Sequence, residues 1–227
     1  MLKRMLCLLL LPALLCSAAL ADEYFTETAF ILNGTVITPA QLSAALRFDL
    51  FDAAASCAAN GYAYSIVDPD NIVDALDKTL FELQSDIIML QSAEEMGLTE
   101  LSYSDLVSVM KDAESQWQRY TNIIGSENGL AYLPAGFHKP EGGADSEEIT
   151  RLYLAGFGVT MDELLSRAYN DMVEQKLKAA VTAEMADITE EERTEAYANW
   201  LVEQFDYASL EEDSIGIAEA CVRLWPQ

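Results

Sequence analysis

The residues that most often carry catalysis or bind metals are scarce in this sequence. Among its 227 residues there is one histidine, His138, and there are only four cysteines. His138 lies in a stretch rich in glycine and proline with no nucleophile motif beside it, which favours a surface loop residue over a catalytic base. The sequence also has no G-x-S-x-G, H-E-x-x-H, phosphate-loop or dinucleotide-binding pattern. We therefore expect no enzymatic activity, no metal site and no cofactor.

Basic residues are also few. The chain has 13 lysines and arginines against 38 aspartates and glutamates, which gives a formal net charge of −25 at pH 7. Such a charge repels nucleic acid and anionic lipid head groups, and it favours basic or neutral partners. It therefore predicts a protein that does not bind nucleic acid. A solvated exterior explains the acidity more simply than a charge-selective binding face does.

A long apolar run occurs only at the N-terminus. Lys3 and Arg4 precede the apolar stretch from Met5 to Leu15, and small residues follow up to Ala21. This pattern is typical of a secretory signal peptide, residues 1–21, with cleavage after Ala21. We expect an exported, extracytoplasmic protein, either retained at the cell envelope or released. Removal of the leader would leave 206 residues and, because Lys3 and Arg4 are its only charged side chains, a net charge of −27.

Cys16 raises the alternative of a lipid-anchored protein. Lipid attachment normally needs a small residue before the cysteine, and the bulky Leu15 stands there instead. After Ala21 no apolar run approaches the roughly 18 residues needed to cross a bilayer. The sequence therefore predicts no membrane insertion once the leader is removed.

The two cysteines that remain after cleavage, Cys57 and Cys221, are far apart in the sequence. Neither belongs to a C-x-x-C pair, which argues against a thiol oxidoreductase. In an exported protein the two can form a disulfide that ties the C-terminal tail to the first helix. The alternative is that both are ordinary core residues.

A short hairpin is expected just after the leader. Asn33-Gly34 suits a two-residue turn with positive φ angles, and the β-forming pairs Phe30-Ile31 and Val36-Ile37 flank it. Thr38 then has the properties of an N-cap, with Pro39 at the first helical position and Gln41 closing a capping box.

The rest of the chain is predicted to be helical, with apolar residues at helical spacing and capping signals at the helix starts. The expected helices are Pro39 to Ala59, Asp68 to about Gly97, Tyr103 to Ile124, Ser146 to Leu154, Thr160 to about Met185, Thr189 to about Phe205, and a short one in the tail that ends near Trp225. In the helix from Tyr103, one face carries Leu106, Met110, Ala113, Trp117, Tyr120 and Ile124, so we expect this face to pack on the preceding helix.

The segment from Gly125 to Gly158 differs from the rest because glycines and prolines interrupt it repeatedly. We expect a loop-rich insertion. Its apolar side chains, among them Tyr132, Leu133 and Phe137, are more numerous than a solvated linker needs. The sequence leaves open whether this segment docks on the helices or contacts a partner.

Four stretches together resemble the N-terminal chaperone domain of SurA and PrsA type foldases. They are Phe30 to Thr38, Ile88 to Leu98, Gly158 to Leu165 and Ile188 to Glu192, and the resemblance covers roughly Phe25 to Trp200. It implies a mainly α fold, an orthogonal multi-helix domain with a short N-terminal β-hairpin or strand. On this basis residues 22–200 form a helical chaperone domain with an insertion at about 125–158, and residues 201–227 form a C-terminal helical tail.

The resemblance also implies a function, which is the transient binding of unfolded or extended segments of exported proteins. A parvulin peptidyl-prolyl isomerase domain commonly follows the chaperone domain in this family. Fewer than 40 residues follow Thr189, which is too few for a parvulin fold of about 100 residues, so we expect no isomerase catalysis.

Aromatic side chains suit the binding of varied apolar segments. The expected client-binding residues are Trp117, Tyr120, Tyr132, Leu133 and Phe137, with core packing as the competing explanation for each. A different class of function also stays open, an accessory or scaffold protein that docks one dedicated exported partner.

Overall fold

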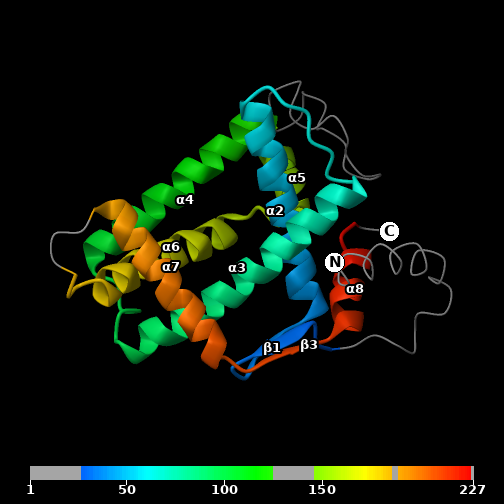
Figure 1. Cartoon of the computed structure of the whole chain (residues 1–227). Helices are drawn as coiled ribbons and strands as arrows, with labels where there is room; N and C mark the ends of the chain where they lie inside the picture. Colours follow the sequence, from blue (N-terminus) through cyan, green and yellow to red (C-terminus); the bar gives the residue numbers. More distant parts are fainter. Residues whose placement is uncertain (1–26, 125–145, 186–188, 226–227) are drawn as a thin grey trace. The chain divides into compact units, whose positions relative to one another are not determined.

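A computed structural model of the chain describes residues 27–124, 146–185 and 189–225. These residues form seven helices and one small three-stranded antiparallel sheet, so the expected mainly helical fold with an N-terminal hairpin is confirmed (Figure 1). The elements are β1 (Phe30–Leu32), β2 (Thr35–Ile37), α2 (Pro39–Ala59), α3 (Pro69–Glu95), α4 (Tyr103–Ile124), α5 (Ser146–Gly156), α6 (Met161–Val181), α7 (Glu190–Tyr207), β3 (Leu210–Glu212) and α8 (Ser214–Val222).

The described chain divides into two compact units. Unit 1 contains residues 27–80, 119–124, 146–160 and 210–225, and unit 2 contains residues 81–118 and 161–209 with a gap at 186–188. The boundaries fall inside α3 and α4, so each of these helices contributes to both units. Residues 210–225 belong to the same unit as the N-terminal hairpin.

The sheet of unit 1 has the strand order β2-β1-β3. Asn33 and Gly34 both have positive φ angles, 50° and 82°, as the predicted two-residue turn requires. β3 was not predicted, because Leu-Glu-Glu has low strand propensity and all three of its residues are exposed. Its strand conformation depends on pairing with β1.

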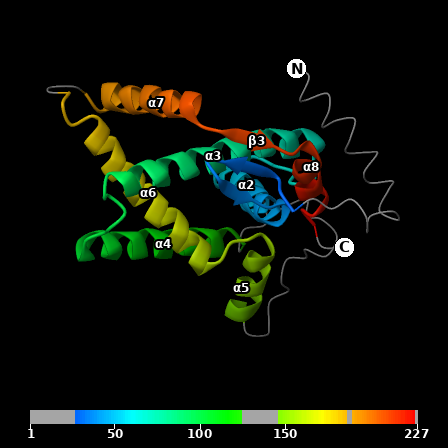
Figure 2. The same ribbon diagram turned by 90° about the horizontal axis from the view of Figure 1, so that it is seen from below.

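α2 and α8 begin at the same end of this sheet. Both β2 and β3 run antiparallel to β1, and one capping residue separates each from the helix that follows. Thr38 and Gln41 form the predicted capping box of α2. Asp213 caps α8 by accepting a hydrogen bond from the Ile215 N–H at 2.9 Å. The two helices consequently lie side by side (Figures 1 and 2).

This arrangement separates the two cysteines, which are both partly buried thiols. Cys57 lies 18 residues beyond Pro39 and Cys221 lies 7 residues beyond Ser214. At the rise of an α-helix, Cys57 is then roughly 16 Å farther from the sheet than Cys221, whereas a disulfide joins Cα atoms less than about 7 Å apart. The structure therefore favours two separate, partly buried thiols over a disulfide.

Aromatic rings fill the core of unit 1. The Phe51 ring lies 5.0 Å from the Phe157 ring and 5.5 Å from the Tyr120 ring, measured between centroids. Phe157 also contacts Trp225, which follows α8, with the ring centroids 6.4 Å apart. Because Phe51 is on α2 and Phe157 follows α5, the cluster connects segments that are distant in the sequence.

The core of unit 2 is formed by α3, α6 and α7. Its buried members are Met89, Ala93, Val173, Leu177 and Tyr197, and Trp200 packs against them. α6 was predicted to reach Met185 but ends at Val181.

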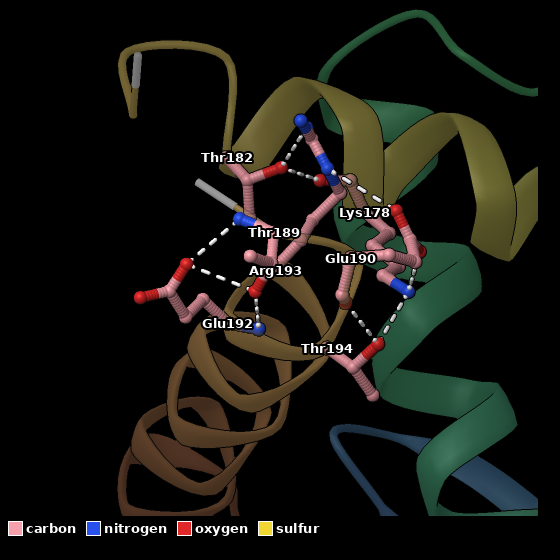
Figure 3. A network of polar contacts seen from close by, with 7 residues as sticks. All are labelled: Lys178, Thr182, Thr189, Glu190, Glu192, Arg193 and Thr194. Atoms are coloured by element: carbon pink, nitrogen blue, oxygen red, sulfur yellow. Dashed lines mark hydrogen bonds and ion pairs between the residues drawn. The ribbon is translucent and has the colours of Figure 1, made fainter. Parts of the chain in front are cut away.

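A polar network joins the end of α6 to the start of α7 (Figure 3). The Lys178 ammonium donates to Glu190 Oε1 at 2.6 Å and to Thr194 Oγ1 at 2.8 Å. Arg193 donates to Thr182 Oγ1 at 2.9 Å. The predicted capping box at Thr189 is present, and its partner is Glu192.

The packing of unit 1 gives a first testable prediction, at Gly158. Its φ angle is +79°, and a Cβ atom there would lie 3.2 Å from the Ala44 carbonyl oxygen. We expect Gly158→Ala to lower the free energy of unfolding by about 2–3 kcal/mol, because left-handed strain and a backbone contact add together. Urea unfolding followed by circular dichroism measures this loss.

Gly97→Ala is the matched control. Gly97 also has a positive φ, +69°, but a Cβ atom there would meet nothing within 4 Å. We expect a loss of only about 1 kcal/mol from the backbone strain. Equal losses for the two variants would contradict the close packing of Gly158 on α2.

Candidate client-binding surface

Tyr120, one of the five predicted client-binding residues, belongs to the core of unit 1. It is only 3% exposed, and its ring contacts those of Phe48 and Phe51. Its hydroxyl donates to Asp52 Oδ1 at 2.7 Å. Core packing, the competing explanation, is therefore the role of Tyr120 in this structure.

Of the other four predicted residues, only Trp117 lies in the part of the chain that the structure describes. Trp117 is on α4 and is partly buried. Tyr132, Leu133 and Phe137 lie outside the described residues, as does His138. Their proposed role in client binding stays a prediction.

A different set of apolar side chains is exposed on α4, and we call it the α4 stripe. It consists of Tyr103, Leu106 and Met110, which are 84%, 45% and 56% exposed. Their spacing of three and then four residues places them on one face of the helix. The three side chains therefore form a continuous apolar surface on unit 2 that no described residue covers fully.

This corrects the expectation that Leu106 and Met110 pack on the preceding helix. Among residues 103–122 of α4, the buried ones are Val109, Ala113 and Tyr120, which lie on the neighbouring arc of the helix. The two arcs together are wider than one packed interface, so one of them is left in solvent. Val109, an apolar residue outside the predicted face, was the signal in the sequence that could have revealed this.

The start of α4 is held in place by charged and polar contacts. Ser102 and Asp105 exchange hydrogen bonds across the first turn, and the Lys176 ammonium of α6 lies 2.7 Å from Asp105 Oδ2. Hydrogen bonds from Lys176 and Ser102 lower the pKa of Asp105 to about 2. Asp105 is therefore ionised at neutral pH, and the α4 stripe is presented by a helix whose first turn is fixed to α6.

A second anchor lies just before α4. The Tyr169 hydroxyl of α6 donates to the Thr99 carbonyl oxygen at 2.7 Å. Surfaces on anchored helices need little ordering when a partner binds, which lowers the entropic cost of binding.

Carboxylates whose charge packing partly desolvates are the second unusual feature of unit 2. Asp86 of α3 accepts a hydrogen bond from Asn170 Nδ2 of α6 at 3.0 Å, and burial raises the pKa of Asp86 to about 6. Burial likewise raises the pKa of Asp171 and of Glu174. The buried Tyr197 side chain of α7 lies close enough to Glu174 and Asp86 to interact electrostatically with both. Asp86, Asn170 and Tyr197 thus bring together polar groups of α3, α6 and α7.

The described residues offer little for other chemistry. Among residues 27–124, 146–185 and 189–225, no group of three or more histidines, cysteines, aspartates and glutamates is arranged to hold a metal ion. In the same part of the chain, every helix is too short or too polar to span a bilayer. The exposed apolar surface is thus the feature of unit 2 with the clearest relation to binding.

Comparisons of the chain with protein-family models, with curated proteins and with solved structures found no match. The candidate surface therefore rests on the geometry of this chain alone.

The partly buried Asp86 gives a prediction for the pH dependence of stability. Its pKa is higher in the folded protein, about 6, than the ordinary value of 3.8 that it has when unfolded. The folded state therefore binds its proton first, and stability rises as the pH falls from about 6 to about 4. We expect Asp86→Asn to raise the free energy of unfolding at pH 7.5 by about 1–3 kcal/mol and to weaken this acid stabilisation. Urea unfolding at pH 7.5 and at pH 5 measures both effects.

Glu95→Gln serves as the control, because Glu95 is exposed at the end of α3. This variant should leave the pH dependence almost unchanged. A loss of stability in Asp86→Asn at pH 7.5 would show that the ionised carboxylate stabilises the unit, contrary to our reading.

Proposed function

We propose that this chain is an exported, holdase-like chaperone domain of the SurA and PrsA N-terminal type. In this proposal the mature protein, Asp22 to Gln227, binds unfolded or extended segments of secreted proteins and slows their aggregation, without isomerase catalysis. It carries no cofactor, and its clients are polypeptides. The observation that carries the proposal is the α4 stripe, an exposed apolar surface on a helix that Lys176 and Asp105 hold in place.

The physical basis is the burial of apolar surface. Unfolded chains aggregate through the apolar segments that they expose. A protein that covers such segments reversibly therefore slows aggregation. Tyr103, Leu106 and Met110 present an aromatic, a branched and a flexible side chain in one row. Methionine adapts to differently shaped partners, and a tyrosine gives a large contact area with few rotatable bonds.

The order of elements supports the family part of the proposal. The hairpin, the capped start of α2, the end of α3 at Glu95, the α6 start after Gly158 and the capping box at Thr189 all occur where the resembling stretches lie. Because one fold can serve several functions, a binding experiment tests the chaperone function directly.

The experiment is the suppression of light scattering from an aggregation-prone, chemically unfolded client diluted into buffer with the mature chain. We expect suppression at a near-equimolar ratio that persists at high salt, because apolar contacts are not screened. The triple variant Tyr103→Ser, Leu106→Ser, Met110→Ser should lose most of this suppression. These residues are exposed, so circular dichroism and the midpoint of unfolding should change little.

The double variant Tyr62→Ser, Val67→Ser is the matched control, since both residues are exposed apolar side chains of unit 1. It should suppress aggregation as well as the natural sequence does. Full suppression by the α4 triple variant would refute the α4 stripe as the binding surface. In that case Tyr132→Ser, Leu133→Ser and Phe137→Ser test the remaining predicted residues.

A second function is favoured by the rigidity of the α4 stripe. A fixed apolar row also suits an accessory or scaffold protein that docks one dedicated exported partner. Measuring suppression for several unrelated clients separates the two functions. A general chaperone should protect most of them, whereas a dedicated partner protein should protect none.

A further inference from the structure

A second exposed apolar surface lies on unit 2, where α7 packs on α3. The rings of Phe81 and Phe205 stack with centroids 5.8 Å apart and planes at 16°. Phe81 is nevertheless 58% exposed, and Val202 on α7 is 60% exposed. We call Phe81, Val202 and Phe205 the α7 patch. Large apolar side chains gain stability only when they are covered, so their exposure here points to a partner.

Acidic side chains flank this patch along α7. Exposed carboxylates at Glu191, Glu195 and Asp206 share one side of the helix with Val202, at spacings of four, seven and four residues, and Glu203 adjoins them. Arg193 is the only basic residue of α7.

The two cations nearest the first turn of α7, Arg193 and Lys178, are engaged with that turn. Arg193 donates to Thr182, which directly follows α6, and pairs with Glu190, and Lys178 also pairs with Glu190 (Figure 3). Both basic groups are therefore engaged at the first turn of α7. The carboxylates beside the patch, Glu195, Glu203 and Asp206, lie at least one turn farther along the helix.

The charge identifies the class of partner. A second copy of this chain, with the same excess of acidic residues, would be repelled, and so would nucleic acid or an anionic lipid surface. A segment with apolar side chains on one face and lysines or arginines around them can cover the exposed rings and form ion pairs with the carboxylates. An exported polypeptide is the source that fits the proposed function.

We propose that the α7 patch and its flanking carboxylates bind a basic amphipathic segment of an exported polypeptide. This inference rests on the proposed function, because that function supplies exported polypeptides as partners. It adds that the clients bound here are basic and amphipathic. The α7 patch and the α4 stripe consist of different residues, so an experiment can refute one proposal and leave the other standing.

The test uses fluorescence anisotropy with a labelled helical peptide of about 18 residues, or five turns, that has leucines on one face and lysines on the other. One control peptide contains the same leucines and lysines in an order that removes the apolar face. Another keeps the amphipathic pattern with glutamate in place of lysine. We expect the mature chain to bind the first peptide at least tenfold more tightly than either control at physiological salt.

Two variants locate the binding on α7. The double variant Phe81→Ser, Val202→Ser should weaken binding of the amphipathic peptide about tenfold or more. The triple variant Glu195→Gln, Glu203→Gln, Asp206→Asn should weaken it to a similar extent and reduce its salt dependence. Because the triple variant changes only exposed side chains, it keeps the test valid if the loss of Phe81 disturbs folding.

The matched control is Glu94→Gln, Glu95→Gln, Glu100→Gln, which removes three exposed carboxylates at the other end of α3 and just beyond it. It should change the affinity less than twofold. An equal loss in this control, or equal binding of the reordered peptide, would overturn the inference and assign the binding to the net charge alone.

The α4 triple variant separates this inference from the proposed function. It should lose aggregation suppression but still bind the basic amphipathic peptide at the α7 patch. If the natural chain binds the peptide at the α7 patch but suppresses no aggregation, the chaperone proposal fails while the α7 surface stands. If the natural chain suppresses aggregation but does not bind the peptide, the α7 inference fails while the chaperone proposal stands.

Discussion

The pairing of β3 with β1 is the interaction on which unit 1 depends. Leu32 faces Leu210 across the pair, and the Asp213 N–H donates to the Ala29 carbonyl oxygen at 2.9 Å, just before α8 begins. An isolated two-stranded hairpin is marginally stable in water, and a third strand makes it part of a core. The same pairing sets α8 beside α2 and brings Trp225 to Phe157, so it completes the aromatic core.

Unit 2 is built differently, because its helices are fixed largely by side-chain contacts. Met89, Val173 and Leu177 supply the apolar core, while the pairs Lys178–Glu190 and Lys176–Asp105 fix α7 and α4 to α6. Exposed ion pairs contribute little stability individually, but several of them define where each helix lies. The helices are thus positioned while two of their apolar faces are left in solvent, which is the physical requirement for a surface that binds other chains.

The acidic composition has two different consequences in unit 2. On the outside of α7, carboxylates such as Glu195 and Asp206 surround exposed apolar side chains and select for basic partners. Inside, Asp86 keeps a carboxylate in the contact between α3 and α6, where burial disfavours its charge. We therefore expect unit 2 to be more stable below pH 6 than at neutral pH.

The local structure of this chain could be predicted from its sequence. Asn33-Gly34, Thr38 and Thr189 act through neighbours within four residues, so the turn and the helix starts were predictable. The tertiary structure alone decided that Leu-Glu-Glu at 210–212 is a strand, that Tyr120 is core, and that Leu106 and Met110 are exposed. Strand pairing and burial depend on contacts between distant residues, and helical periodicity shows which side chains share a face but not which face is covered.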